Sequence, residues 1–514
     1  MPETGSRRLA ASKKVGLGLL YGILIGLLFA ITYTQSPLYT SNQNQYFLHG
    51  LARAGFGYLE HDWLANTLDP TPVFSGLVYL TYRLTHTPQL FYLYYAILLG
   101  IYLWCLVGIF DLIFKISQDR ARLALFLALV FLVHSAALRY LLSRTLGDSW
   151  SYILEDGMAS QRLLGPVFQP STFGVLLVVS IYLFLKKRPI LAVFAAALAA
   201  IVHPTYLLSA AALTIAYMIV QYSETRKWKG TLLTGSVALL AVLPILAYVY
   251  TSFGSAPLDS AARAQDILVN YRIPFHALIG RWFDLTSVVK LIILAAGLVV
   301  LWKTRLFWIL MIPVIAGVLL TFIQVISRNN ALALLFPWRV STFLVPLATT
   351  ALLAWLVIWL FRHWPGLARH NLIFWISGLI ILSVTMVGMI RIRLDFQRQA
   401  SDPENGALAF AAANAAPGQY YLVPIDMQDF RLATGLPIYV EFKSIPYQDQ
   451  DVLEWSRRIQ VADLFYKRSE CGWVEKIASY GVTHVIVTPK MFHLKCSAWE
   501  ELYQDPYYGV YRLR

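Results

Sequence analysis

Charged residues are scarce in this sequence of 514 residues. Asp, Glu, Lys and Arg together make up 14% of it, whereas hydrophobic residues make up 58%. A water-soluble protein of this length needs more charge to cover its surface. The shortage of charge therefore argues against an ordinary soluble protein and favours one whose surface faces lipid.

The usual motifs of soluble enzymes are missing as well. The sequence has no Walker loop, no Gly-rich dinucleotide motif after a strand, no His-Glu-x-x-His and no Gly-x-Ser-x-Gly. We therefore expect no nucleotide and no organic cofactor. The formal charge of +14 comes from short Lys and Arg clusters between apolar runs. Because these clusters do not form a basic face, nucleic acid is not expected as a partner.

What the sequence does have is a series of apolar runs of about 17 to 25 residues, the length of a membrane-spanning helix. They lack the alternation of a membrane β-barrel. We predict an α-helical polytopic membrane protein with eleven spans. The predicted spans are 15–33, 91–114, 123–143, 171–186, 189–203, 205–221, 231–251, 286–302, 306–325, 341–361 and 372–392.

The basic clusters predict the orientation of these spans. Arg7, Arg8, Lys13 and Lys14 precede the first span, which has no clear cleavage site and is expected to be retained. Five later clusters fall on the same side as the N-terminus if all eleven segments cross. They are Lys115/Arg120/Arg122, Lys186/Lys187/Arg188, Arg226/Lys227/Lys229, Lys303/Arg305 and Arg362/Arg369. The positive-inside rule then places the N-terminus in the cytoplasm and the C-terminus outside a plasma or inner membrane.

The chain is expected to have two domains. Residues 1–394 form the transmembrane domain, with a large outer loop at 34–90 in which the short apolar run 72–84 suits an interfacial or re-entrant helix. Residues 395–514 are more polar and predict a small extracytoplasmic α/β domain. Its expected strands are 420–423, 438–442 and 484–487, and its expected helices are 452–466 and 473–480. Cys471 and Cys496 form either a disulfide or two free thiols there.

Arginines are unexpectedly frequent on the predicted outer side. Arginine binds phosphate and carboxylate through two hydrogen bonds at once, so an anionic ligand at this surface would explain them. The alternative is a set of ordinary loop arginines paired with acids or lipid headgroups. Asp148, His203 and His276 are predicted to lie at the same depth of the membrane as the arginines. The candidates for binding a donor phosphate or substrate are therefore Arg144, Asp148, His203, Arg272, His276, Arg328 and Arg339.

The first outer loop carries the acidic motif Glu60-His61-Asp62. Two carboxylates beside a histidine can hold a metal ion, Mg²⁺ or Mn²⁺, or one of them can serve as a general base. On an extended segment Glu60 and Asp62 would point the same way, and on a helix they would diverge. In the alternative reading they are solvated loop acids.

This layout resembles the GT-C superfamily of membrane glycosyltransferases: a basic N-terminus, one span, a long outer loop with a Glu-x-Asp motif, and many further spans. The segment 480–487, Tyr-Gly-Val-Thr-His-Val-Ile-Val, is similar to a strand entry in the outer domains of some members. The resemblance implies that Glu60 and Asp62 are catalytic. The sequence departs from the family pattern after the first span, where many members have Asp and this chain has Asn42 and Asn44. The base is then Glu60, Asp62 or Asp69, or the activity is lost.

The resemblance implies transfer of a sugar from a polyprenyl-phosphate donor to a glycan, lipid or protein acceptor at the outer face of the membrane. The arginines and His203 or His276 would stabilise the departing phosphate. The alternative function is that of a transporter or lipid-handling protein for an anionic substrate, without catalysis.

Overall fold

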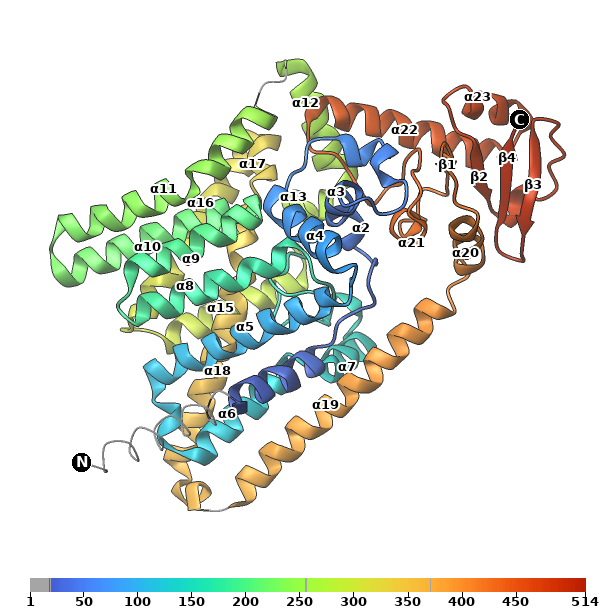
Figure 1. The fold of residues 1–514 in the computed structure, drawn as a ribbon. Helices are drawn as coiled ribbons and strands as arrows, with labels where there is room; N and C mark the ends of the chain where they lie inside the picture. The colour runs from blue at the N-terminus through green and yellow to red at the C-terminus, as the bar shows by residue number, and fades with distance from the viewer. Residues whose placement is uncertain (1–17, 19, 255–256, 370) are drawn as a thin grey trace, which may run out of the picture.

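A helical body and a smaller C-terminal part make up the molecule, as the computed structural model shows (Figure 1). It describes residues 18, 20–254, 257–369 and 371–514. The N-terminal basic cluster from Arg7 to Lys14 lies outside the described residues. The chain is an integral membrane protein that is mostly helical, with a small sheet near its C-terminus.

Within the described residues, each of the eleven predicted segments coincides with helical structure. The helices are Leu20–Tyr33, α5 (Leu90–Phe114), α6 (Arg120–Val133), α7 (Ala136–Leu146), α8 (Val175–Leu185), α9 (Pro189–Val202), α10 (Leu207–Thr225), α11 (Trp228–Phe253), α15 (Leu285–Val300), α16 (Arg305–Ser327), α18 (Ser341–His363) and α19 (Asn371–Ala400). Six helices of the described chain are long and apolar enough to cross a membrane, and the bent pair α6 and α7 makes a seventh. Four more apolar helices are shorter. The membrane class is confirmed, and the count of eleven spans stays a prediction.

The predicted single helix at 123–143 is wrong, because α6 and α7 meet at an angle of 50°. Ser135 lies between them in an extended conformation, and its hydroxyl accepts a hydrogen bond from the backbone N–H of Leu138. A serine in this position starts a new helix by satisfying a free N–H group. The bend therefore has a local cause in the sequence.

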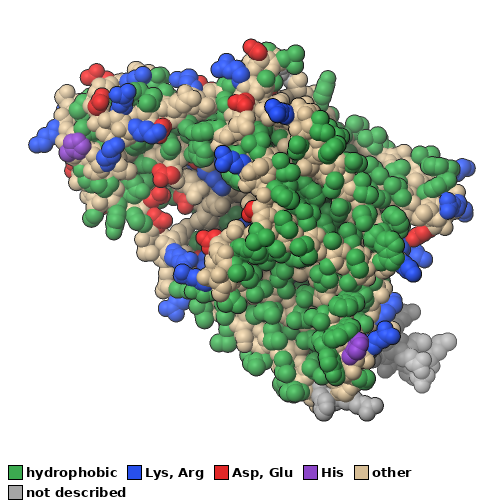
Figure 2. Space-filling model, turned by 180° about the vertical axis from the view of Figure 1, so that it is seen from behind, with side chains coloured by type: hydrophobic (Ala, Val, Ile, Leu, Met, Phe, Trp, Pro, Cys, Tyr) green, Lys and Arg blue, Asp and Glu red, His purple; other side chains and the backbone are tan. Residues whose placement is uncertain are grey.

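Consecutive helices of the body alternate in direction, and the helices that pack most closely include both neighbours and non-neighbours in the chain. α8 packs on α9, α9 on α11, α10 on α16, α15 on α18, and α6 on α19. Because of this alternation, the basic turns 186–188, 226–229 and 303–305 lie at one end of the body, and the segments 203–206, 257–284 and 328–340 lie at the other. Hydrophobic side chains cover most of the face of the body seen in Figure 2.

Short helices fill the second end of the body. In the first outer loop these are α2 (Gln43–Tyr46), α3 (Leu48–Arg53), η1 (Leu59–His61), η2 (Leu64–Asn66) and α4 (Pro72–Thr85). The later ones are η4 (Asp148–Trp150), η5 (Pro170–Gly174), η6 (Pro204–Tyr206), α12 (Leu258–Asp266), η7 (Ile267–Arg272), α13 (Pro274–Ala277), α14 (Ile279–Trp282), α17 (Asn330–Leu334) and η8 (Pro337–Val340). The expected short helix at 72–84 is α4, which packs on α3 and α9. On the basic side, η3 (Ile116–Gln118) and η9 (Pro365–Arg369) complete the body.

The C-terminal part is a four-stranded sheet with helices. It contains α20 (Asn405–Ala413), β1 (Tyr421–Leu422), α21 (Phe430–Thr434), α22 (Asp449–Arg468), α23 (Cys471–Ala478), β2 (His484–Val487), η10 (Pro489–Met491), β3 (Trp499–Gln504) and β4 (Gly509–Leu513). The strand order is β1-β2-β4-β3, and only β1 and β2 are parallel. α19 runs through the predicted domain boundary at 395, so one continuous helix leads from the body to this part (Figure 1).

Two strand assignments from the sequence are corrected. The predicted strand 438–442 reduces to one bridge between Ile438 and Tyr421, because the Glu441 carboxylate accepts hydrogen bonds from the N–H groups of Lys443 and Ser444 and turns the chain. Strands β3 and β4 were missed because neither forms a continuous apolar run: Glu500 and Glu501 follow each other in β3, and Arg512 interrupts β4. Arg512 pairs with Glu500 across the two strands at 2.7 Å.

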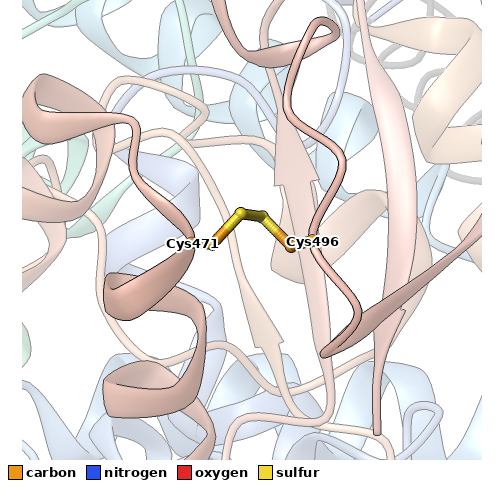
Figure 3. The surroundings of a disulfide bond; sticks show 2 residues. All are labelled: Cys471 and Cys496. Atoms are coloured by element: carbon orange, nitrogen blue, oxygen red, sulfur yellow. A yellow bond between two sulfur atoms is a disulfide. The ribbon is translucent and has the colours of Figure 1, made fainter.

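Cys471 and Cys496 are joined in a disulfide, 25 residues apart in sequence (Figure 3). The bond ties the first residue of α23 to the loop before β3. Cross-linking at this separation restricts the unfolded chain and stabilises the fold by about 3 kcal/mol. We expect Cys471→Ser/Cys496→Ser to speed hydrogen exchange in α23 and β3 on the order of 100-fold. Exchange in α23 and β3 of Cys105→Ser, which removes the buried free thiol, is the control. Unchanged exchange in the double variant would contradict this role.

Candidate functional site

Five basic side chains gather at the end of the body that faces the C-terminal part. We call them the cationic cluster: His203, Arg272, His276, Arg339 and Lys443. His203 follows α9, Arg272 ends η7, His276 lies in α13, Arg339 lies in η8, and Lys443 comes from the C-terminal part. Segments separated by up to 240 residues thus contribute to one site, and the structure brings together four of the seven binding residues expected from the sequence.

Prolines shape the backbone around the cluster. Pro204, Pro274 and Pro337 each begin a short helical turn, where the missing N–H of proline costs no hydrogen bond. The turn after α9 leaves the His203 side chain only 4% exposed, with its ring centroid 5.9 Å from that of Tyr46. His276 hydrogen-bonds through its ring Nδ1 to the carbonyl oxygen of Ala159.

The three cations of the cluster, Arg272, Arg339 and Lys443, have no carboxylate partner in the described part of the chain. Arg272 donates to the carbonyl oxygen of Lys443, and its guanidinium lies 5.1 Å from the ring centroid of Phe442. The guanidinium of Arg339 lies 5.0 Å from the ring centroid of Tyr206. Within the described chain, neither arginine nor Lys443 forms an ion pair. The Nε atoms of both arginines are buried without a hydrogen-bond partner.

The charges of the cluster residues influence one another's pKa. Burial and the charges of Arg339, Arg272 and Lys443 together lower the pKa of His276 to about 4, although its hydrogen bond to the Ala159 carbonyl acts in the opposite direction. Burial and the neighbouring Arg272 also lower the pKa of Lys443. His276 is therefore neutral at physiological pH, and three positive charges surround it. Like charges in a partly buried site repel one another, so a bound anion would stabilise the arrangement.

The polar segment 42–45, which follows the first span, helps to position the cluster. Asn42 donates to Gln169 Oε1 at 2.8 Å, and Asn44 donates to Asp429 Oδ1. Gln45 exchanges two hydrogen bonds with the backbone of Ile445, two residues after Lys443. The amides thus connect the first outer loop both to the body and to the C-terminal part. Asn42 and Asn44 act as structural donors here, a role that a carboxylate could not fill.

A buried ion network makes a second connection. Arg431 donates to Asp62 Oδ2 at 2.7 Å and to Glu441 Oε1 at 3.2 Å, and all three side chains are at most 2% exposed. Asp62 also accepts from the backbone N–H groups of Ile438, Leu64 and Ala65. Glu441 fixes the turn that carries Lys443. The Asp62 carboxylate is therefore fully hydrogen-bonded, and it acts on the cluster indirectly, through Arg431 and Glu441.

The three residues of the acidic motif do not share a site. Glu60 lies in η1, its side chain is 62% exposed, and it faces His61 at 3.5 Å. Asp62 points the other way, into the ion network. The predicted metal set Glu60, His61 and Asp62 is therefore wrong, and the described chain holds no group of three potential metal ligands of the His, Cys, Asp or Glu type. Asp69, the third acid of the loop, is buried with Arg53 at 3.8 Å.

A different pair of acids lies in the loop that leads to the cluster. Glu155 and Asp156 are buried in the loop after η4, where Arg139 pairs with Glu155 at 2.9 Å and Arg162 pairs with Asp156 at 2.6 Å. Burial raises the pKa of Asp156 to about 7 despite the opposing charge of Arg162. A carboxylate with this pKa is suited to exchange protons near neutral pH.

The backbone after Asp156 joins the acids to the cluster. Met158 N–H donates to Ser341 Oγ at 2.7 Å, two residues from Arg339, and Ala159 accepts from His276. A Cβ at Gly157 would lie 2.6 Å from Ser341 Oγ, so only glycine fits there. The sequence contained a signal for this loop, because Glu155-Asp156-Gly157 and Arg162 fall between two apolar runs on the predicted outer side. Lys443 had no such signal.

The remaining predicted residues lie elsewhere. Arg144 and Asp148 line a separate cavity beside α19. Arg328 is exposed at the end of α16 and contacts no residue of the cluster among the interactions of the described chain. The structure does not bring these three residues to the cluster, because the predicted membrane level fixes only the depth of a residue and not its lateral position. Their predicted role in binding stays a prediction.

The fold and the cluster define a helical membrane protein with a polar, positively charged site at one end of its helices. A family model described as Domain of unknown function (DUF6798) matches residues 403–462. No curated protein sequence matches the chain. Among solved structures, the chain is similar to the crystal structure of ArnT from Cupriavidus metallidurans bound to undecaprenyl phosphate, at 12% identity over 98% of both chains and with a TM-score of 0.48.

Because Asp62 is part of a buried network, its removal should affect stability. Breaking a buried ion pair leaves an uncompensated charge and costs about 3 kcal/mol or more. We expect Asp62→Asn to lower the free energy of unfolding by about that amount in a denaturant titration of the purified protein. Glu60→Gln is the matched control and should stay within about 0.5 kcal/mol of the parent. Equal stability of the two variants would argue against the network.

Proposed function

We propose that the protein is a GT-C-type membrane glycosyltransferase that moves a sugar from a polyprenyl-phosphate donor to an acceptor at the outer face of the membrane. The observation that carries the proposal is the cationic cluster, in which Arg272, Arg339 and Lys443 lie together with no carboxylate partner among the residues that the structure describes. Phosphate is an anion that arginine and lysine hold well, and its negative charge grows as the sugar leaves.

The surroundings of the cluster suit a lipid-linked phosphate. η8, which carries Arg339, packs on α16. The part of α16 that leads toward this end exposes large apolar side chains, with Phe322 64% and Ile326 67% exposed. A polyprenyl chain would lie along such a surface while its phosphate meets the cations. The cations gather at one end of the helices, which favours chemistry at a membrane face over transport across the membrane.

Asp156 is the base in this proposal, in place of Glu60 and Asp62. The acceptor hydroxyl oxygen forms a bond to the anomeric carbon of the sugar, and the bond from that carbon to the phosphate oxygen breaks. The electron pair of the broken bond stays on the phosphate, which the cations stabilise, and the hydroxyl proton passes to the Asp156 carboxylate. Asp156 suits this role because its pKa is raised to about 7.

The cluster and the C-terminal part face the outer compartment in this proposal. The turns 186–188, 226–229 and 303–305 are rich in Lys and Arg and lie at the opposite end of the helices. Basic turns of this kind mark the cytoplasmic side. The disulfide between Cys471 and Cys496 supports the same orientation, because such bonds persist in oxidising compartments.

The donor site is tested by neutralising its charges one at a time. A charge-assisted hydrogen bond contributes about 1.5 to 3 kcal/mol, so Arg272→Gln and Arg339→Gln should each lower kcat/KM on the order of 10- to 100-fold. The assay uses membranes supplied with a panel of radiolabelled polyprenyl-phosphate sugars. Arg328→Gln, an exposed arginine at the same end of the body, is the matched control and should retain full activity. Parental transfer by both cluster variants would refute the site.

The base is tested by the pH dependence of transfer. The Asp156 carboxylate accepts a proton only when it is ionised, so kcat/KM should rise with pH up to about 7 and then level off. His276, with a pKa of about 4, adds no step above pH 5. Asp156→Asn should lose at least about 100-fold in rate, whereas Glu60→Gln should keep both the rate and the profile. A flat profile in the parent between about pH 5 and pH 8 would contradict the assignment.

A further inference from the structure

A second polar cavity lies beside α19, apart from the cationic cluster. It has a volume of about 520 Å³, within the range of small-molecule sites. Residues of α7, the turn after it, the end of the first helix and α19 line it. It shares no lining residue with the cluster. Figure 1 shows α7 and α19 side by side at this level, and the two helices pack on each other.

Four arginines line this cavity: Arg139, Arg144, Arg391 and Arg398. Arg139 is neutralised by Glu155 behind it. Arg391 and Arg398 share the single carboxylate of Asp395, at 2.9 and 3.5 Å. Two arginines facing one aspartate leave an excess of one positive charge.

On the opposite wall, Arg144 forms no ion pair among the described residues, and its guanidinium lies 5.5 Å from the ring centroid of Tyr140. The Asp148 carboxylate accepts a hydrogen bond from Ser143 Oγ. The charges of Arg144 and Asp148 balance each other across this wall. With Arg139 neutralised by Glu155, the three other arginines face two lining carboxylates, so the cavity keeps an excess of one positive charge.

The cavity opens at the edge of the apolar surface. On α7, Tyr140 and Leu141 are 54% and 56% exposed, and on α19 Ile390 and Phe396 are 55% and 44% exposed. Beyond these residues α19 leaves the apolar part of the body and leads to the C-terminal part. A ligand in the cavity thus has its polar group among arginines and its apolar portion against exposed side chains. This combination is typical of a lipid headgroup site.

We propose that the α7–α19 cavity binds the phosphodiester headgroup of an anionic membrane phospholipid. A phosphodiester carries one negative charge, which matches the excess positive charge of the lining. Arg144 and the pair Arg391 and Arg398 approach from opposite walls and bind the phosphate oxygens. The hydroxyls of Ser143 and Ser151 donate to Asp148, so their oxygens are left to accept hydrogen bonds from the rest of the headgroup. The acyl chains lie along the exposed faces of α7 and α19. This site is independent of the proposed glycosyl transfer.

The test is native mass spectrometry of the full-length protein, titrated with phosphatidylglycerol or phosphatidylcholine. We expect phosphatidylglycerol to bind more tightly, because phosphatidylcholine has no net charge. Each arginine near an anionic headgroup contributes about 1 kcal/mol, so Arg144→Gln and Arg398→Gln should each weaken phosphatidylglycerol binding about fivefold. Arg144→Lys keeps the charge and should bind nearly as the parent does. Arg263→Gln, an exposed arginine outside the cavity, is the control for general surface charge.

Competition separates the two sources of phosphate. Inorganic phosphate and glycerol phosphate lack acyl chains, so millimolar concentrations should not displace the lipid if the apolar faces contribute. Displacement by either would show that the cavity takes a free phosphate, and equal binding of the two lipids would overturn the proposal. Unaltered phosphatidylglycerol binding by both Arg144→Gln and Arg398→Gln would also overturn it. Because the readout is binding, it is unaffected by whether the protein transfers sugar.

Discussion

The buried ion network of Asp62, Arg431 and Glu441 is the interaction on which the rest of the structure depends. It joins the first outer loop to the C-terminal part at a place where no side chain is more than 2% exposed. Isolated, these charges would be costly to bury, and they are tolerated because each has its partners in place. The network fixes the turn after Glu441, and this turn delivers Lys443 to Arg272. A site made from both parts of the chain exists only while this connection holds.

The cationic cluster differs from the ion network in that its positive charges are not neutralised by carboxylates of the described chain. Its charges are close enough to lower the pKa of His276 and of Lys443, yet none has a carboxylate partner within the described chain. Repulsion between buried cations is typical of functional sites, and here it would be relieved by a bound anion. The neighbouring loop of Asp156 supplies a group that can take a proton at neutral pH. In the proposed function, the cluster holds the phosphate and Asp156 takes the proton, the two tasks that transfer from a phosphate-linked donor requires.

The sequence predicted the helices well because their signal is local. Long apolar runs and the caps between them fix where α5 or α16 begins and ends. Four members of the cluster could also be predicted, since His203, Arg272, His276 and Arg339 are polar residues at the ends of apolar runs. The bend at Ser135 was not predicted, because a single capping hydroxyl causes it inside a long apolar run. The role of Asp62 was not predicted either, because its partner Arg431 lies 369 residues away in the sequence. Lys443 was missed for the same reason, because only tertiary packing places it among the arginines.

The most direct test of the central claim is a cryo-electron microscopy structure of the protein in nanodiscs with an added polyprenyl phosphate. If the cluster is the donor site, phosphate density will lie between Arg272, Arg339 and Lys443, with the lipid chain running along α16. Phosphate density at any other place, with the cluster empty, would contradict the account.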